Sequence, residues 1–190
     1  MKIPDSGMPE EQSWNSFFNI PEIVQWLDLK NVNGPVVEIG CGYGTFTIPV
    51  AKGSRYPVHA FDIEFHMIEA TRKNVRNAGL SNVDISVRDV IEKGTGLESS
   101  SAGMVLLFNI LHFDGQRKLL AEASRILQNG GIAAIIHWRK DIETPRGPGI
   151  AVRPDQNSIL KHITGLDLKF SGNSRILEPY HWGMQLVNVP

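Results

Sequence analysis

One short stretch decides the fold of this chain: Val36-Val37-Glu38-Ile39-Gly40-Cys41-Gly42-Tyr43-Gly44. An acid stands near the end of an apolar run, and glycines follow at alternate positions before a helical pattern from Thr45 to Ala51. Glycines permit a sharp turn and let a ligand approach bare main chain, while N–H groups at a helix start favour an anionic group. The spacing predicts a buried strand, a cofactor-binding turn and a helix, with a plain glycine-rich turn as the alternative.

The dinucleotide fingerprint G-x-G-x-x-G is not met by this turn. The fingerprint would need glycine at position 45, but Thr45 stands there and Gly44 comes one residue early. A nicotinamide cofactor, and with it an NAD(P)-dependent oxidoreductase, is therefore the weaker alternative.

Short β-type runs alternate with helical patterns along the chain, which is typical of βαβ units around a parallel sheet. The last two β-type runs meet near Pro179, and they are expected to be antiparallel because a parallel crossover needs about a dozen residues or more. The predicted strands cover residues 36–39, 58–61, 83–87, 104–108, 132–136, 166–177 and 182–189. The predicted helices cover residues 21–29, 45–51, 68–78, 119–127 and 154–163.

Capping residues and glycines suggest where some of these elements begin and end. Asp114 is expected to cap the helix that contains Leu119, and Gly130 with Gly131 is expected to end that helix. The interruption at residues 172–173 fits either a bulge or a turn. Residues 143–154 are rich in proline, glycine and arginine and are expected to form a loop.

The composition fits one domain and argues against several kinds of partner. A chain of 190 residues with 42% hydrophobic composition suits a single domain over residues 1–190. Lysine and arginine number 19 against 20 acidic residues, so no global positive field exists to attract nucleic acid or an anionic membrane. Neither partner is expected.

The lone cysteine, Cys41, excludes an internal disulfide framework and fits a reducing compartment, so a cytoplasmic location is expected. Residues 1–12 lack the apolar core of a signal peptide, and no apolar run approaches the roughly 20 residues of a membrane span. The histidines show neither H-x-x-x-H nor H-E-x-x-H spacing, so no metal site is predicted, although scattered carboxylates leave room for Mg²⁺.

The glycine stretch resembles the first motif of the class I, seven-stranded methyltransferases, E/D-x-G-x-G-x-G. Glu38, Gly40, Gly42 and Gly44 match that motif position for position, and the resemblance covers most of the chain. Within the family the chain is most similar to small methyltransferases related to quinone-biosynthesis enzymes. The resemblance implies an α/β fold with a doubly wound seven-stranded mixed sheet of order 3-2-1-4-5-7-6, its last strand antiparallel and helices on both faces.

The resemblance also implies S-adenosylmethionine as cofactor and S-adenosylhomocysteine as product. The glycine turn would wrap the methionine part, with Glu38 and the loop backbone at its amino and carboxylate groups. Asp62 would close the second strand, about 20 residues beyond the glycines, and accept hydrogen bonds from both ribose hydroxyls, a role that Glu64 could share. The implied cofactor residues are Glu38, Gly40, Cys41, Gly42, Tyr43, Gly44, Asp62, Ile63, Met67, Asp89, Val90 and Asn109.

Two of these assignments carry an alternative. Asp89 and Val90 are expected to close the third strand beside the adenine, although a single strand-end aspartate is more often a turn or cap residue. Asn109 is the only residue shared with the N-P-P-Y pattern of enzymes that methylate base amino groups, because Ile110 and Leu111 replace its prolines. This departure argues against DNA methylation and for a small-molecule acceptor.

The acceptor is expected beyond the carboxyl ends of the fourth and fifth strands. His112 and His137 stand there as candidate general bases, with packing or capping as the alternative. Residues 141–155 are expected to form a substrate-side loop in which Arg146 and Arg153 clamp an anionic group, or else a plain exposed connection. Trp14 belongs to an expected N-terminal helical cover over residues 1–30, unless its aromatic cluster only completes the core. A protein that binds the cofactor without methyl transfer is a rival function.

Overall fold

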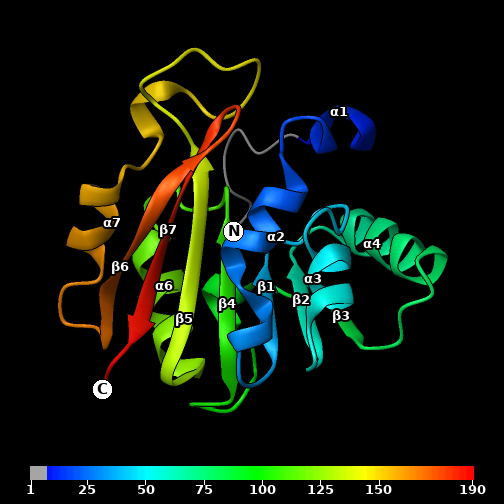
Figure 1. The fold of residues 1–190 in the computed structure, drawn as a ribbon, viewed down its shortest axis with the longest axis horizontal. Helices are drawn as coiled ribbons and strands as arrows, with labels where there is room; N and C mark the ends of the chain where they lie inside the picture. Colours follow the sequence, from blue (N-terminus) through cyan, green and yellow to red (C-terminus); the bar gives the residue numbers. More distant parts are fainter. Residues whose placement is uncertain (1–7) are drawn as a thin grey trace.

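A seven-stranded sheet runs through the centre of the protein, with helices on both of its faces (Figure 1). The computed structural model describes residues 8–190. The strands are β1 (Val36–Ile39), β2 (Val58–Asp62), β3 (Val83–Val87), β4 (Ala102–Phe108), β5 (Leu127–Trp138), β6 (Leu168–Leu177) and β7 (His181–Asn188).

The strand order is β3-β2-β1-β4-β5-β7-β6, which confirms the predicted order. β1 pairs in parallel with β2 and β4, and the pairs β2·β3 and β4·β5 are also parallel. β7 is antiparallel to both β5 and β6. Because the chain order reverses beside β1, the carboxyl ends of β1 and β4 form the switch point where ligands of open α/β sheets bind.

The helices divide between the two faces of the sheet. α5, α6 and α7 pack in one hydrophobic cluster, and α2 and α3 pack in another on the opposite face. The helices are α1 (Glu11–Asn15), α2 (Ile20–Leu27), α3 (Thr47–Gly53), α4 (Phe65–Asn77), α5 (Val90–Lys93), α6 (Gln116–Ile126) and α7 (Gln156–His162). Two 3₁₀ turns, η1 (Leu29–Asn31) and η2 (Ile150–Val152), complete the elements.

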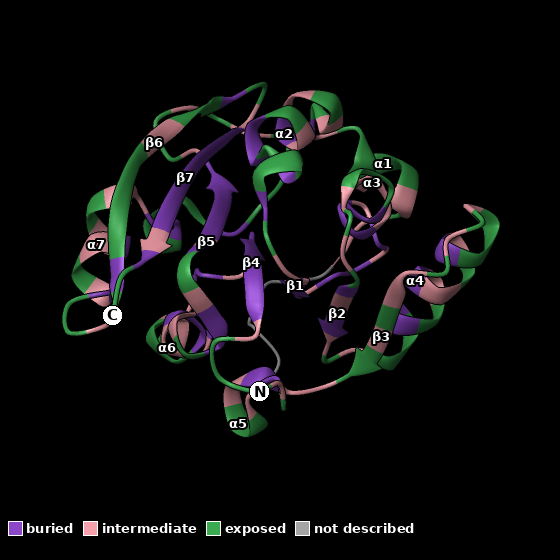
Figure 2. Cartoon of the chain, turned by 60° about the horizontal axis from the view of Figure 1, so that its bottom comes forward, coloured by how far each residue is buried: buried purple, intermediate pink, exposed green. Residues whose placement is uncertain are grey.

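Burial explains why the central strands read as apolar runs. Every residue of β4 is buried, because helices cover both sides of the sheet there. Figure 2 shows β4 buried along its length and β6, at the edge, mostly exposed. In β6 only the two terminal residues, Leu168 and Leu177, are buried. None of the helices over residues 8–190 is long and apolar enough to cross a membrane.

Several predicted boundaries differ from the structure. α6 has Gly115 at its N-cap, without a side-chain cap, so the prediction of Asp114 as the cap was wrong. Gly130 and Gly131 do not end α6; they lie inside β5, because buried Leu127 pairs with Ala102 and starts the strand directly after the helix. A register shift on β4 opposite this stretch accommodates the change.

β3 ends at Val87, so Asp89 and Val90 do not close it as predicted. Asp89 is instead the N-cap of α5, which is the cap role given above as its alternative; helix α5 itself was not predicted. Its carboxylate accepts hydrogen bonds from the N–H groups of Ile91 at 3.1 Å and Glu92 at 3.2 Å. At the other edge of the sheet, residues 172–173 stay within β6, where the β6·β7 register shifts between Phe170 and Ser174.

Candidate functional site

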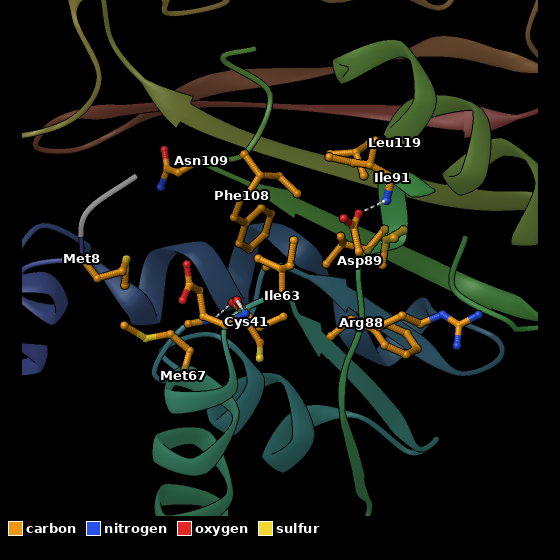
Figure 3. A pocket seen from close by; sticks show the side chains of 18 of the residues that line it. Met8, Cys41, Ile63, Met67, Arg88, Asp89, Ile91, Phe108, Asn109 and Leu119 are labelled. Carbon is orange, nitrogen blue, oxygen red and sulfur yellow. Dashed lines mark hydrogen bonds between the residues drawn. The ribbon is translucent and has the colours of Figure 1, made fainter. Parts of the chain in front are cut away.

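A cavity opens at the carboxyl ends of β1, β2 and β4, at the switch point of the sheet (Figure 3). Its volume is about 170 Å³, enough for roughly ten water molecules, and so for a ligand of many atoms. Nine of the twelve predicted cofactor residues line it: Gly40, Cys41, Gly42, Asp62, Ile63, Met67, Asp89, Val90 and Asn109.

The glycine turn forms one wall of the cavity and is tied to the tip of β2. The N–H groups of Gly40 and Cys41 both donate to the carbonyl of Phe61, at 2.7 and 3.0 Å. The N–H of Gly42 donates to the Asp62 carboxylate at 2.9 Å. These bonds fix the turn against the neighbouring strand before any ligand is present.

The glycines expose bare main chain on the cavity side. Gly42 has φ +54°, a left-handed conformation that other residues rarely adopt. A Cβ added to Gly42 would meet only the terminal methyl of Met8, at 3.1 Å. At Gly40 an added Cβ would come within 2.8 Å of Ile110, a residue that also lines the cavity. At Gly42 the turn therefore leaves space that a side chain would take, whereas the space beside Gly40 is filled by the Ile110 side chain.

Asp62 stands at the end of β2 with its carboxylate on the cavity wall. One oxygen accepts the Gly42 N–H, and the other accepts the Glu64 N–H at 2.9 Å. Burial raises the pKa of Asp62, and these two N–H groups oppose the rise. Ile63 and Met67 follow it along the cavity, as Figure 3 shows, and supply apolar surface there.

Three predicted cofactor residues, Glu38, Tyr43 and Gly44, do not line the cavity. Glu38 is fully buried and accepts a short hydrogen bond from the Thr47 hydroxyl. Burial raises its pKa to about 8, so the carboxyl is protonated at neutral pH. The Tyr43 hydroxyl donates to the carbonyl of Pro9 at 2.8 Å, and Gly44 faces Thr71.

Asn109 follows β4 directly and is a buried polar residue in the cavity wall. It has φ +57°, an unusual conformation for a residue other than glycine, and its side chain is 9% exposed. Its backbone N–H donates to the carbonyl of Ile136 at 2.8 Å. Neither atom of its side-chain amide has a hydrogen-bond partner within residues 8–190. Because an unsatisfied buried amide is costly, this position suits contact with a polar ligand group.

The two candidate bases lie close together but do not line the cavity. Nε2 of His137 is 3.4 Å from Nδ1 of His112, and both rings are buried. Burial first, and the neighbouring His112 and His181 next, hold the pKa of His137 well below its usual range. His137 is therefore neutral at physiological pH.

The substrate-side residues differ in what they contact. Trp14 lines the cavity and packs edge-on against Phe18, with ring centroids 5.0 Å apart. Arg153 is buried, and its guanidinium forms hydrogen bonds within the loop. It donates to the carbonyl of Pro148 at 2.9 Å and to the Thr144 hydroxyl at 2.7 Å. The Arg146 side chain is exposed.

Several cavity residues were missed from the sequence. Met8 approaches the glycine turn from the N-terminal segment, and Phe46 and Phe108 add aromatic surface. Arg88 precedes Asp89 and donates to the carbonyl of Lys93 at 3.1 Å. Arg88 and Phe108 each had a signal, because they precede the predicted residues Asp89 and Asn109. Met8 lies far in sequence from the glycine turn that it approaches. Within residues 8–190 no group of three or more His, Cys, Asp or Glu residues could hold a metal ion.

Comparison with known proteins places this architecture in a family. Residues 36–131, about half of the chain and including the glycine turn, match the family described as methyltransferase domain. The chain belongs to the methyltransferase domain family. This membership confirms the resemblance drawn from Glu38 and the alternating glycines.

Two curated proteins resemble this methyltransferase-domain protein over a similar stretch. Dimethylglycine N-methyltransferase of Parasynechococcus marenigrum (strain WH8102) is 36% identical over 99 residues, which span 52% of this chain and 35% of that protein. Aklanonic acid methyltransferase DauC of Streptomyces sp. (strain C5) is 33% identical over 99 residues, which span 50% of this chain and 44% of that protein. The matches thus cover less than half the length of either relative.

A solved structure shares the fold of the methyltransferase-domain protein over nearly its whole length. The SAM-dependent methyltransferase from Aquifex aeolicus superposes with a TM-score of 0.80 and 20% identity, covering 93% of each chain. Further relatives are named for ribosomal RNA and for protein acceptors. The comparisons therefore give the family and the fold, and they leave the class of acceptor open.

Proposed function

We propose that this protein binds S-adenosylmethionine in the cavity and transfers its methyl group to a small-molecule acceptor. One observation carries the proposal: the bare glycine turn and the Asp62 carboxylate face the same cavity. Main-chain space beside a carboxylate suits a ligand that combines an amino-acid tail with a ribose. Family membership over residues 36–131 supports the same conclusion.

The residues on the cavity wall fit the parts of this cofactor. Asp62 would accept hydrogen bonds from the ribose hydroxyls, because each of its oxygens uses one N–H donor and keeps further acceptor capacity. Ile63 and Met67 would flank the adenine, with Asp89 and Val90 beside its edge. The main chain of the glycine turn, which includes Tyr43 and Gly44, would receive the methionine part, with Glu38 buried in β1 just before the turn and Asn109 in the cavity wall.

S-adenosylmethionine supplies an activated methyl group, so the protein mainly has to align the acceptor and exclude water. A base is required only for acceptors that must lose a proton. For such acceptors we propose the buried pair His112 and His137, because a neutral imidazole nitrogen can accept a proton. The lowered pKa of His137 makes it a weak base, so alignment rather than proton abstraction is proposed as the main contribution.

A small-molecule acceptor is proposed on two grounds. The balanced charge of the chain offers no general attraction for nucleic acid, and the relatives of highest identity quoted above are named for dimethylglycine and aklanonic acid. We assign Trp14 to the acceptor side, as part of an N-terminal cover over residues 1–30, of which residues 1–7 lie outside the described structure. We assign the loop over residues 141–155, with Arg146 and the anchored Arg153, to the same side. One domain over residues 1–190 in the cytoplasm completes the proposal.

Thermal shift and labelling together test the proposed function. S-adenosylhomocysteine should raise the melting temperature, whereas NAD and NADP should not, because only a ligand of the folded state stabilises it. Incubation with methyl-tritiated S-adenosylmethionine, once with a metabolite extract and once with an unfractionated lysate, should then label the small-molecule fraction. Heat-inactivated protein is the control.

Three results would contradict the proposal. Stabilisation by NAD or NADP alone would favour an oxidoreductase. Saturable cofactor binding without any labelled product would favour a binding protein. Label that appears only in the protein or RNA fraction of an unfractionated lysate would move the acceptor to a macromolecule.

A further inference from the structure

Thr71 lies directly beneath the glycine turn, on the buried side of α4. Its side chain is fully buried, and its hydroxyl donates to the carbonyl of Gly42 at 2.6 Å. Thr71 is one of the residues of α4 that recur at helical spacing and are buried. The hydrogen bond gives it a contact with the turn that a purely apolar core residue would lack.

Thr71 lies against the turn at three positions, Cys41, Gly42 and Gly44. Besides Gly42, its oxygen lies 3.8 Å from the sulfur of Cys41. A Cβ added to Gly44 would come within 3.1 Å of its methyl group. Because the single hydroxyl hydrogen goes to Gly42, the Cys41 thiol is the donor of the second bond. Burial raises the pKa of Cys41, which keeps that thiol protonated.

The peptide units on either side of Gly42 are thereby held by two different elements. Asp62, at the end of β2, accepts the Gly42 N–H, and Thr71, on α4, donates to the Gly42 carbonyl. A trans peptide is planar, with its C=O and N–H directed oppositely. With the Gly42 carbonyl fixed toward α4, the N–H of Tyr43 must point away from α4.

We propose that Thr71 is a positioning residue for the cofactor: its hydroxyl fixes the peptide between Gly42 and Tyr43 and so sets the shape of the turn that receives the ligand. The inference rests on the proposed function. Without the hydroxyl, the buried Gly42 carbonyl would lack its donor, and the glycine, which has few steric limits, would let the peptide rotate. The main chain offered to the ligand would change.

Calorimetric titration with S-adenosylhomocysteine tests this role in the full chain. Thr71→Val keeps the shape and removes the hydroxyl, and its dissociation constant should rise about tenfold. Thr71→Ser keeps the hydroxyl and should stay within about threefold of the wild type. Thr71→Ala removes the same group with less bulk, and it replaces Thr71→Val if that variant does not fold.

Thr95 offers a matched control. It is buried, and its hydroxyl donates to Glu122 at 2.6 Å, away from the cavity wall. Thr95→Val should lower the melting temperature and leave the dissociation constant unchanged. If Thr71→Val and Thr71→Ala also lose only stability, the positioning role is overturned, while wild-type binding still supports the proposed function. If the wild type itself does not bind S-adenosylhomocysteine, the proposed function fails first.

Discussion

Gly42 combines an unusual backbone conformation with space that a ligand would need. Its φ of +54° strains any residue with a Cβ, and its N–H and carbonyl are held by Asp62 and Thr71. The added Cβ would point toward the Met8 methyl at 3.1 Å, on the cavity side of the turn. A substitution here therefore acts on both stability and ligand space, and these effects have to be separated.

The Gly42→Val variant should lose S-adenosylhomocysteine binding by more than about 30-fold, the equivalent of ~2 kcal/mol of overpacking in the site. Gly79→Val is the control, because Gly79 has a similar φ of +67° but nothing within 4 Å of an added Cβ. Both variants should melt at lower temperature, and only the first should lose affinity in calorimetry. Equal affinities in the two variants would place the cofactor pocket elsewhere.

At the scale of elements, the segment over residues 141–155 is an anchored loop. Arg153 lies at its end and donates to the carbonyls of Pro148 and Arg139 and to the Thr144 hydroxyl. All three acceptors are neutral, so the arginine cross-links the loop without an ion pair to any of them. The N–H donors of Arg153 thus point to main-chain and hydroxyl oxygens of the protein. The expectation from the sequence that Arg153 clamps an anionic group of the methyl acceptor stays a prediction.

Replacing Arg153 by methionine should loosen this loop while keeping an apolar stem of similar length. The carbonyls and the hydroxyl would lose their donor, so amide hydrogen exchange over residues 141–155 should accelerate by about tenfold or more. Arg175→Met, at an exposed arginine of β6, is the control and should leave exchange unchanged. Unaltered exchange in Arg153→Met would show that packing alone orders the loop.

At the scale of the whole molecule, buried titratable groups shape the dependence of stability on pH. Burial lowers the pKa of His181 to about 3 and that of His137 well below 6.5, so below pH 6.5 the unfolded chain binds protons that the folded chain does not. Glu38 acts oppositely, since its folded pKa of about 8 exceeds the ordinary value of 4.5. Its contribution is present at low pH and is lost as the pH rises toward 8.

These opposing groups predict that the free energy of unfolding peaks near pH 6.5. Each histidine contributes a slope of about +1.4 kcal/mol per pH unit below that point, and Glu38 a slope of about −1.4 kcal/mol per pH unit from 4.5 to 8. Between pH 5 and 6.5, His181→Phe should lower the slope of the free energy of unfolding against pH, measured by urea unfolding, by about 1.4 kcal/mol per pH unit. A slope equal to that of the wild type would mean that His181 is already protonated in the folded protein.

Much of the fold follows from local patterns in the sequence. β1 and β3 begin and end where their apolar runs predict, because the alternation of apolar runs and helical patterns is a local property. Boundaries failed where tertiary pairing overrode a local signal. Gly130 and Gly131 read as a helix stop, but the pairing of Leu127 with Ala102 draws them into β5.

The cofactor turn could be found from the sequence because its chemistry depends on residues that are close together in the chain. Alternating glycines after an apolar strand specify a turn with exposed main chain, and this local property does not depend on the rest of the fold. Asp62 was found for the same reason, since the end of a strand can be read from the pattern before it. Tertiary structure alone decided what lies around that turn. Met8 and Thr71 come from distant segments, and neither carries a local signal that would direct it to Gly42.

The resemblance carried by the glycine stretch implied the family and the strand order, and the sequence itself located the wall of the cavity formed by the glycine turn and Asp62. The tertiary structure decided the other walls, the burial of the His112–His137 pair and the use of Arg153 as a loop anchor. The reason is physical: backbone conformation depends on neighbours in the chain, whereas burial and side-chain partners depend on which segments pack together in space.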